Sequence, residues 1–293
     1  MTKPTFRILE PGDERALEAF LLPRIESSMF LIGNLRRSGL QDDGQPYSGT
    51  YVAACDDDRV VAVVAHYWNQ NLVVQAPRYM DALWRVAVEA SQRPLGGLIG
   101  PSDHVGQVKG AVGADEERVR MDETELLYRL RLEQLAVPTK LATGQLEARR
   151  IEPGDVKLIL QWTVAYSIEA LQEADGLALR NSCRASVERS LAEGRTWVLL
   201  DRGRPVACSS FNTALREAVQ VGGVWTPPHL RRRGYARSVV AASLLDARRE
   251  GAHTAILFTG EGNLPAQQAY RALGFRHIGH YRMVFYQPPL TYG

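Results

Sequence analysis

The pattern of apolar and polar positions predicts the same series of elements twice along the chain. In the first half, two apolar runs within residues 51–66 flank the polar turn 56–59 and predict a β-hairpin. In the second half, two apolar runs within 196–211 flank the polar turn 201–204 in the same way. The apolar run 60–65 is typical of a buried strand.

The residues that follow each hairpin continue the parallel. A strand, a helix, a short strand, a second helix and a final strand are predicted in that order in both halves. The clearest members are the strands 71–75 and 219–226, the helices 79–92 and 235–250, and the short strands 98–99 and 255–258. We therefore expect two tandem α+β domains, residues 1–140 and 141–293, joined near 136–143.

A short turn begins each half. Arg7-Ile-Leu-Glu-Pro-Gly-Asp13 is echoed by Arg149-Arg-Ile-Glu-Pro-Gly-Asp155. Each turn leads into an amphipathic segment, 16–25 or 156–166, and its Asp is suited to accept the unpaired N–H groups at the start of that helix. Together with the shared element order, the repeated turn indicates a duplication.

Composition narrows the class of protein. The 293 residues are 45% hydrophobic and carry a formal net charge of +2, which argues for a globular protein and against a strongly basic nucleic-acid binder. No apolar run reaches the roughly 20 residues of a membrane span, and the N-terminus lacks the apolar core of a secretory signal. Cys55, Cys183 and Cys208 fit neither a disulfide framework nor paired metal ligands. We expect a cytoplasmic protein without a metal or a membrane partner.

The chemistry is expected at the strand 219–226 and the loop after it, Pro227 to Gly234, which leads into a helix. A loop of this kind turns backbone N–H groups toward one point at a helix N-terminus, where they stabilise an anion such as a pyrophosphate. Gly234 permits a close approach of the backbone to the phosphates. Gly222-Gly223, within the strand, predicts a β-bulge or else a merely weakened edge strand.

Two motifs in this half resemble those of the GNAT acetyltransferase superfamily. Arg231-x-x-Gly234-x-Ala236 is similar to the family's acyl-CoA pyrophosphate loop. Asn263, then Ala266, Tyr270 and Gly274-Phe275, resemble its second signature in order and spacing. The resemblance implies two tandem GNAT folds, each a mixed central sheet flanked by helices, with acetyl-CoA as cosubstrate.

The resemblance also assigns roles in cofactor binding. Backbone groups of the strand end are expected to pair with the pantetheine arm, and loop N–H groups to bind the pyrophosphate. One of the three consecutive arginines is expected to meet the 3′-phosphate, whereas a nucleic-acid patch is the disfavoured alternative. The residues implied are Val224, Trp225, Thr226, Arg231, Arg232, Arg233, Gly234, Tyr235, Ala236, Arg237, Asn263 and Ala266. Asn263 is also suited to cap the helix that follows.

Catalysis requires a general acid and a general base. Tyr270 matches the family's acid, which protonates the departing thiolate, although packing on Phe275 is the alternative. Glu217, near the start of the strand before the loop, is the candidate base, with a water-relayed group as the other option. Glu169, Glu173 and Asp175 fall where relatives line the acceptor site, either to attract a cationic amine or as a solvated acidic face.

The first half lacks this machinery. Only Ala76-Pro77-Arg78 separates its corresponding strand and helix, so no glycine is present to cradle phosphate and no CoA is expected there. We expect this half to form one wall of the acceptor pocket or a homodimer surface. The polar and aromatic residues suggested for the former role are His66, Tyr67, Trp68 and Asn69.

The expected function is transfer of an acetyl group from acetyl-CoA to a primary amine in a ternary complex. A small-molecule amine is favoured over a protein N-terminus or lysine, because two packed domains can enclose a pocket. One alternative is a non-catalytic acyl-CoA sensor. Another is an activity like that of mycothiol synthase, which the tandem layout also resembles.

Overall fold

The computed structural model describes residues 4–57 and 59–292 of the chain, so Asp58 of the predicted hairpin turn lies outside the described residues. The chain divides into two compact units. Unit 1 comprises Met1–Leu127 together with Ile278–Gly293, and unit 2 comprises Tyr128–His277. No helix in the described part of the chain combines the length and the apolar character that a membrane span requires.

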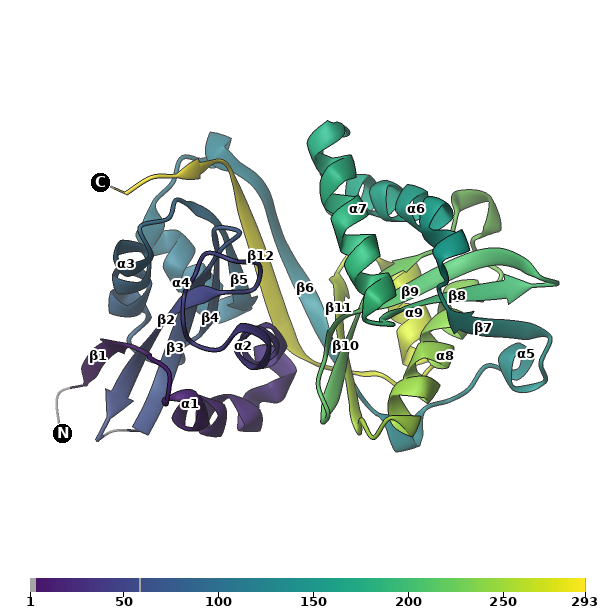
Figure 1. Ribbon diagram of the computed structural model, residues 1–293, viewed down its shortest axis with the longest axis horizontal. Helices are drawn as coiled ribbons and strands as arrows, with labels where there is room; N and C mark the ends of the chain where they lie inside the picture. Colours follow the sequence, from purple (N-terminus) through teal and green to yellow (C-terminus); the bar gives the residue numbers. More distant parts are fainter. Residues whose placement is uncertain (1–3, 58, 293) are drawn as a thin grey trace. The chain divides into compact units, whose positions relative to one another are not determined.

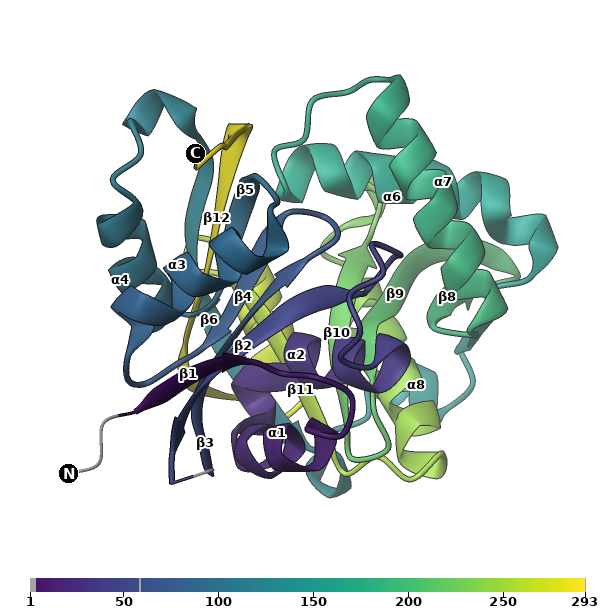
Figure 2. The ribbon, with the colours of Figure 1, turned by 60° about the vertical axis from the view of Figure 1, so that its left-hand side comes forward.

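Unit 1 is a mixed sheet with helices on both faces. Its strands follow the order β1-β2-β3-β4-β5-β12-β6. Helices α1 and α2 pack together on one face, and α3 and α4 on the other (Figure 2). The elements are β1 (Thr5–Ile8), α1 (Glu14–Leu21), α2 (Ile25–Ser38), β2 (Gly49–Asp56), β3 (Arg59–Tyr67), β4 (Asn71–Gln75), α3 (Met80–Ser91), β5 (Leu95–Pro101), α4 (Ser102–Val112), β6 (Val119–Arg131) and β12 (Arg276–Leu290).

Unit 2 repeats this arrangement. After the last residues of β6, its strands follow the order β11-β10-β9-β8-β7. Helices α6 and α7 cover one face, whereas α8 and α9 lie on the other (Figure 1). The elements are α5 (Thr139–Ala142), β7 (Leu146–Arg150), α6 (Val156–Ala170), α7 (Leu177–Ala192), β8 (Thr196–Asp201), β9 (Arg204–Ala214), β10 (Ala218–Trp225), α8 (Tyr235–Arg249), β11 (Thr254–Gly260) and α9 (Leu264–Arg271). The predicted α+β architecture, a mixed sheet flanked by helices in each half, is confirmed.

The cores follow from the apolar runs of the sequence. In unit 1, β3 lies between β2 and β4, and its Val64 is fully buried in a cluster with Leu72 and Leu83. This confirms the run 60–65 as a buried strand. In unit 2, Ile159 and Trp162 of α6 pack on Cys208 and Trp225 of the sheet. Burial of such side chains is the main favourable contribution to folding.

The repeated turn is built from the same contacts in both units. The guanidinium of Arg7 donates to both carboxylate oxygens of Asp13, at 2.6 and 3.0 Å, and that of Arg149 donates to Asp155 at 2.6 and 3.1 Å. The same carboxylates accept the N–H groups of Glu10 and Glu152. The prediction that each Asp caps the following helix is therefore wrong, because the arginine and the turn's own backbone hold the carboxylate.

Two boundaries differ from the sequence-based expectation. The segment expected as one helix over 16–25 is divided between α1 and α2, because a 3₁₀ turn containing Pro23 separates them. The expected division at residue 140 also differs from the two units, since residues 278–293 belong to unit 1. The reason is β12, which pairs with β5 from Tyr281↔Pro101 to Phe285↔Gly97.

Deletion of residues 278–293 is expected to unfold unit 1 and to leave unit 2 folded. The deletion removes the partner of β5 and takes Val284 and Tyr286, both buried, out of the unit 1 core. The loss of a central strand and of these buried side chains is comparable with the typical domain stability of about 5–15 kcal/mol. Hydrogen exchange read by mass spectrometry should show free exchange in β2 to β5 and retained protection in β8 to β10. Retained protection in β2 to β5 would contradict the assignment of β12 to that core.

Candidate active site

Strands β10 and β11 pair only at their beginnings. The parallel register runs from Ala218↔Thr254 to Gln220↔Ile256. Beyond Gln220, the pairing of β10 continues with β9, with a register shift between Gly222 and Trp225. After Gln220, the backbone groups of β10 that face β11 therefore lack the hydrogen bonds that join the two strands at their start. An extended ligand can pair with these backbone groups.

The bulge predicted at Gly222-Gly223 is confirmed. Gly223 has φ +57°, a left-handed conformation that favours glycine. A Cβ atom on Gly222 would lie 2.2 Å from Oδ1 of Asn212, so the Asn212 side chain occupies the space above this glycine. The two glycines therefore allow β10 to bend away from β11 where the register shifts.

The loop after β10 ends at a helix N-terminus, as predicted. Gly234 immediately precedes α8 and has φ +80°, and Arg232 is also left-handed at φ +62°. The first N–H groups of α8 have no partner within the helix, and the helix dipole adds partial positive charge at the same point. This end of α8 can bind an anion.

Two buried polar atoms flank the loop without a hydrogen-bond partner among the described residues. They are Oγ1 of Thr226, a residue that is only 8% exposed, and Nε of Arg237 in the first turn of α8. A buried polar atom without a partner costs free energy, so these atoms favour a bound polar ligand or water. A hydroxyl and a guanidinium at these positions fit an acyl-CoA whose phosphates lie at the start of α8.

Arg231 is held by protein groups at the start of the loop. Its Nε donates to the Thr226 carbonyl at 3.0 Å, and its guanidinium contacts the Glu169 carboxylate at 2.9 Å. The guanidinium also lies 4.9 Å from the centre of the Trp225 ring. Glu169 is therefore not available as a free carboxylate for a cationic amine, contrary to one interpretation of its position.

Side chains of two other predicted cofactor residues serve the fold. Trp225 is buried in the core beneath α6, so only its backbone remains for a ligand. The hydroxyl of buried Tyr235 donates to the carboxylate of Asp201. This contact raises the pKa of the Tyr235 hydroxyl. Both residues thus act on the loop by holding its ends in place.

The second motif forms the start of α9 and the turn after it. Asn263 caps α9 as predicted, because its side chain accepts the N–H of Ala266 at 3.2 Å. Tyr270 is 9% exposed, and its ring lies edge-on to Phe275 with 5.9 Å between centroids. The packing on Phe275 is therefore present, and the catalytic role of the Tyr270 hydroxyl stays a prediction.

Glu217 lies at the paired end of β10. Its carbonyl accepts the N–H of His253, the residue before β11, at 3.1 Å. Gly222 is the fifth residue after Glu217, which corresponds to roughly 16 Å along a strand. Of the other acidic candidates, Asp175 forms an ion pair with Arg180 at 2.8 Å, and the Glu173 N–H donates to the carbonyl of Ser167.

In unit 1, the backbone that follows β4, which corresponds to the loop after β10, is hydrogen-bonded by the unit's own side chains. The N–H of Ala76, which directly follows β4, donates to Nδ1 of His104 at 3.3 Å. Burial lowers the pKa of His104, which keeps this nitrogen available as an acceptor. The Gln75 side chain in turn accepts a hydrogen bond from Ser27 at 2.8 Å. The backbone N–H that follows β4 is thus satisfied within unit 1, and the absence of CoA binding there stays a prediction.

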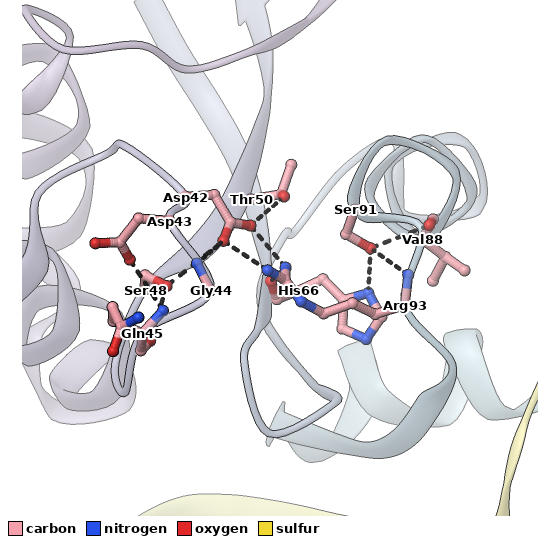
Figure 3. Close-up of polar contacts among 10 residues, drawn as sticks. All are labelled: Asp42, Asp43, Gly44, Gln45, Ser48, Thr50, His66, Val88, Ser91 and Arg93. Atoms are coloured by element: carbon pink, nitrogen blue, oxygen red, sulfur yellow. Dashed lines mark hydrogen bonds and ion pairs between the residues drawn. The ribbon is translucent and has the colours of Figure 1, made fainter.

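His66 belongs to a buried polar network in unit 1 (Figure 3). Its Nδ1 lies 2.7 Å from Oγ of Ser91. Its backbone carbonyl accepts a hydrogen bond from the guanidinium of Arg93, and the same guanidinium forms a bidentate ion pair with Asp42 at 2.6 Å. His66 is fully buried, and Tyr67 donates its hydroxyl proton to Tyr51. Both side chains are therefore part of the core, and neither is exposed to line an acceptor pocket.

Comparison with known protein families identifies the superfamily of the second half of the chain. Residues 158–275 match the model of the acetyltransferase (GNAT) family. The second half of the chain is a GNAT acetyltransferase domain. The sequence matches no curated protein significantly.

Solved structures extend the likeness of fold to the whole chain. A Drosophila protein has a TM-score of 0.66 at 14% identity, with 97% of this chain and 99% of that one covered. A GCN5-related N-acetyltransferase from Sphaerobacter thermophilus has a TM-score of 0.58 at 14% identity, with 96% and 94% covered. A tandem GNAT protein from the clavulanic acid biosynthesis pathway has a TM-score of 0.56 at 15% identity, with 98% and 99% covered. The GNAT domain of unit 2 thus lies within a tandem GNAT fold.

The sequence did not reveal two residues that shape this site. Asn212 occupies the space above Gly222, and Asp201 anchors Tyr235. Asn212 and Asp201 act from strands that are distant in sequence, so no local pattern marks them. Arg237, by contrast, is among the predicted cofactor residues, and the structure adds that its buried Nε has no partner among the described residues.

Protonation of His66 is expected to destabilise unit 1 in acid. Burial lowers the pKa of His66 from 6.5 to about 4, so its contribution to stability is complete above pH 6.5 and is lost as the pH falls toward 4. Between pH 7.0 and 4.5, His66→Gln should flatten the pH dependence of the unfolding free energy by roughly 2.5 kcal/mol. Urea unfolding at pH 7.0 and 4.5 checks this, with exposed His253→Gln as control. Equal pH dependence in both variants would contradict it.

Proposed function

We propose that unit 2 transfers an acetyl group from acetyl-CoA to a primary amine. The observation that carries the proposal is the combination of the open edge of β10 after Gln220 with the glycine-led N-terminus of α8. The first can pair with the pantetheine arm through the backbone of Val224 and Thr226, and the second can bind the pyrophosphate. Membership of the GNAT family in residues 158–275 supports both assignments.

In this proposal the chain's residues act by positioning and by proton transfer. Backbone N–H groups from Arg232 to Ala236 hold the pyrophosphate, and the bulge at Gly222-Gly223 leaves room for the thioester. The amine nitrogen attacks the thioester carbonyl, the C–S bond breaks as the tetrahedral intermediate collapses, and Tyr270 gives its hydroxyl proton to the departing thiolate. We favour a small-molecule amine as acceptor.

The amine must also lose a proton. Glu217 lies roughly 16 Å along β10 from the bulge, on the basis of about 3.3 Å per residue, which is too far for direct abstraction. Glu169 is occupied by Arg231. The geometry therefore favours transfer through water molecules, with Glu217 as a final acceptor.

Calorimetric titration with acetyl-CoA tests the cofactor site before any amine is known. We expect one site per chain, because unit 1 satisfies the N–H of Ala76 with His104 and has no glycine loop after β4. Two sites would overturn that interpretation of unit 1, and no binding would overturn the proposed enzyme. Tight binding without CoA release in a panel of amines would instead favour an acyl-CoA sensor.

Gly234→Glu is expected to weaken acetyl-CoA binding by at least 100-fold, because a like charge placed against a phosphate costs several kcal/mol. The matched control is Gly234→Ala, which carries the same left-handed φ of +80° without the charge. A Cβ at this position meets no atom closer than 3.9 Å, so both variants should fold. Equal affinity of the two variants in calorimetry would contradict the placement of the phosphates.

Tyr270→Phe is expected to lower kcat by about 10²–10⁴-fold and to leave the Kd for acetyl-CoA unchanged. The substitution retains the ring that packs on Phe275 and removes only the proton donor. The measurement is steady-state CoA release with an accepted amine, beside calorimetric binding. Unchanged kcat would mean that another group or water protonates the thiolate.

A further inference from the structure

Arg231 connects three parts of unit 2 that the proposed function needs in fixed positions. It heads the loop that precedes α8, donates to the carbonyl of Thr226 after β10, and forms an ion pair with Glu169 of α6. The loop and the β10 end are the proposed cofactor site. Glu169 lies one residue before the end of α6, and α6 itself packs on β10 through the core around Trp225.

The position of Glu169 explains why it needs a cation. The last turn of an α-helix carries partial negative charge, so a carboxylate there is unfavourable unless a positive group neutralises it. Within the last turn of α6, the cation that contacts Glu169 is Arg231, at 2.9 Å. The pair is partly exposed, at 39% and 52% of the two side chains, and such pairs add little to the stability of a fold. The pair therefore acts mainly on the position of the end of α6 relative to the loop at Arg231.

The segment after α6 continues directly from this point of attachment. Residues 171–176 have no helix or strand, and two of their N–H groups, from Leu171 and Glu173, donate to the carbonyl of Ser167. Ser167 is buried and lies 3.7 Å from the thiol of Cys183 in α7. The start of the segment is thus held to the last turn of α6, and that turn is held to the loop by the pair of Glu169 with Arg231.

Resting on the proposed function, we propose that Arg231 is a positioning residue that clasps the end of α6 to the acyl-CoA loop and is not a ligand of the cofactor phosphates. Through Glu169, the loop is coupled to the end of α6, which packs on β10, and to the segment 171–176 that follows α6. The phosphates are left to backbone N–H groups and to Arg237, whose Nε has no partner among the described residues.

Hydrogen exchange of the full chain with and without saturating acetyl-CoA tests this clasp, the pair of Arg231 with Glu169 that holds α6 to the loop. In the native protein, acetyl-CoA should slow exchange both in 231–238 and in 167–176. In Glu169→Gln, the protection of 231–238 should persist, whereas the gain in 167–176 should be lost. The matched control is Glu250→Gln, which removes another partly exposed Arg–Glu pair of unit 2, with Arg150, and should behave as the native protein does.

The outcomes separate the clasp from the proposed function. If acetyl-CoA protects 231–238 in the native chain but 167–176 responds equally there and in Glu169→Gln, or not at all, the clasp is overturned and the cofactor site stands. If 231–238 gains no protection in the native chain, the cofactor site itself is overturned.

Kinetics supply a second readout that a merely structural role would not move. With an accepted amine, Glu169→Gln should raise KM for the amine by about threefold to fivefold, the upper range for a partly exposed ion pair, while the calorimetric Kd for acetyl-CoA changes little. Arg231→Lys should reproduce this split, because lysine lacks the planar guanidinium that reaches Thr226 and Glu169 together. A large loss of acetyl-CoA affinity in Arg231→Lys but not in Glu169→Gln would instead make Arg231 a cofactor ligand and overturn the proposal.

Discussion

The separation of two parallel strands is the constraint on which the rest of unit 2 depends. Backbone N–H and C=O groups inside a protein must be paired, and β10 gives up its pairing with β11 after Gln220. The cost is tolerable because Gly222 and Gly223 allow the bend and because a ligand can replace the missing strand. The loop before α8, the orphaned Thr226 hydroxyl and the arginine that binds the Thr226 carbonyl all lie at the end of that opening.

The duplicated fold shows the same framework with and without a glycine-containing loop after the corresponding strand. Both units begin with an arginine that grips the aspartate of a Pro-Gly-Asp turn, so the framework at the first strand has been kept. At the position that follows β4, however, unit 1 satisfies its backbone from within, through His104. Its polar residues around His66 and Asp42 are likewise satisfied by each other. A framework of this kind can act as support without binding a cofactor.

The sequence was sufficient for features that depend on local pattern. The element order, the bulge at Gly222-Gly223, the start of α8 at Gly234 and the cap at Asn263 could all be predicted, because each depends on the conformational preference of residues close in sequence. Contacts between segments that are distant in sequence could not be predicted in this way. The pair of Arg231 with Glu169 joins residues 62 apart, and Asp13 and Asp155 bind an arginine where a helix cap was expected.

The placement of β12 has a consequence for how the chain is made. Residues 278–290 of unit 1 are synthesised after all of unit 2, although unit 1 begins first. Unit 1 therefore cannot complete its fold in the usual N-terminal-first order, because the β5 edge stays uncovered until β12 follows. An exposed strand edge invites pairing with other chains, so the nascent protein is vulnerable to aggregation until β12 is in place.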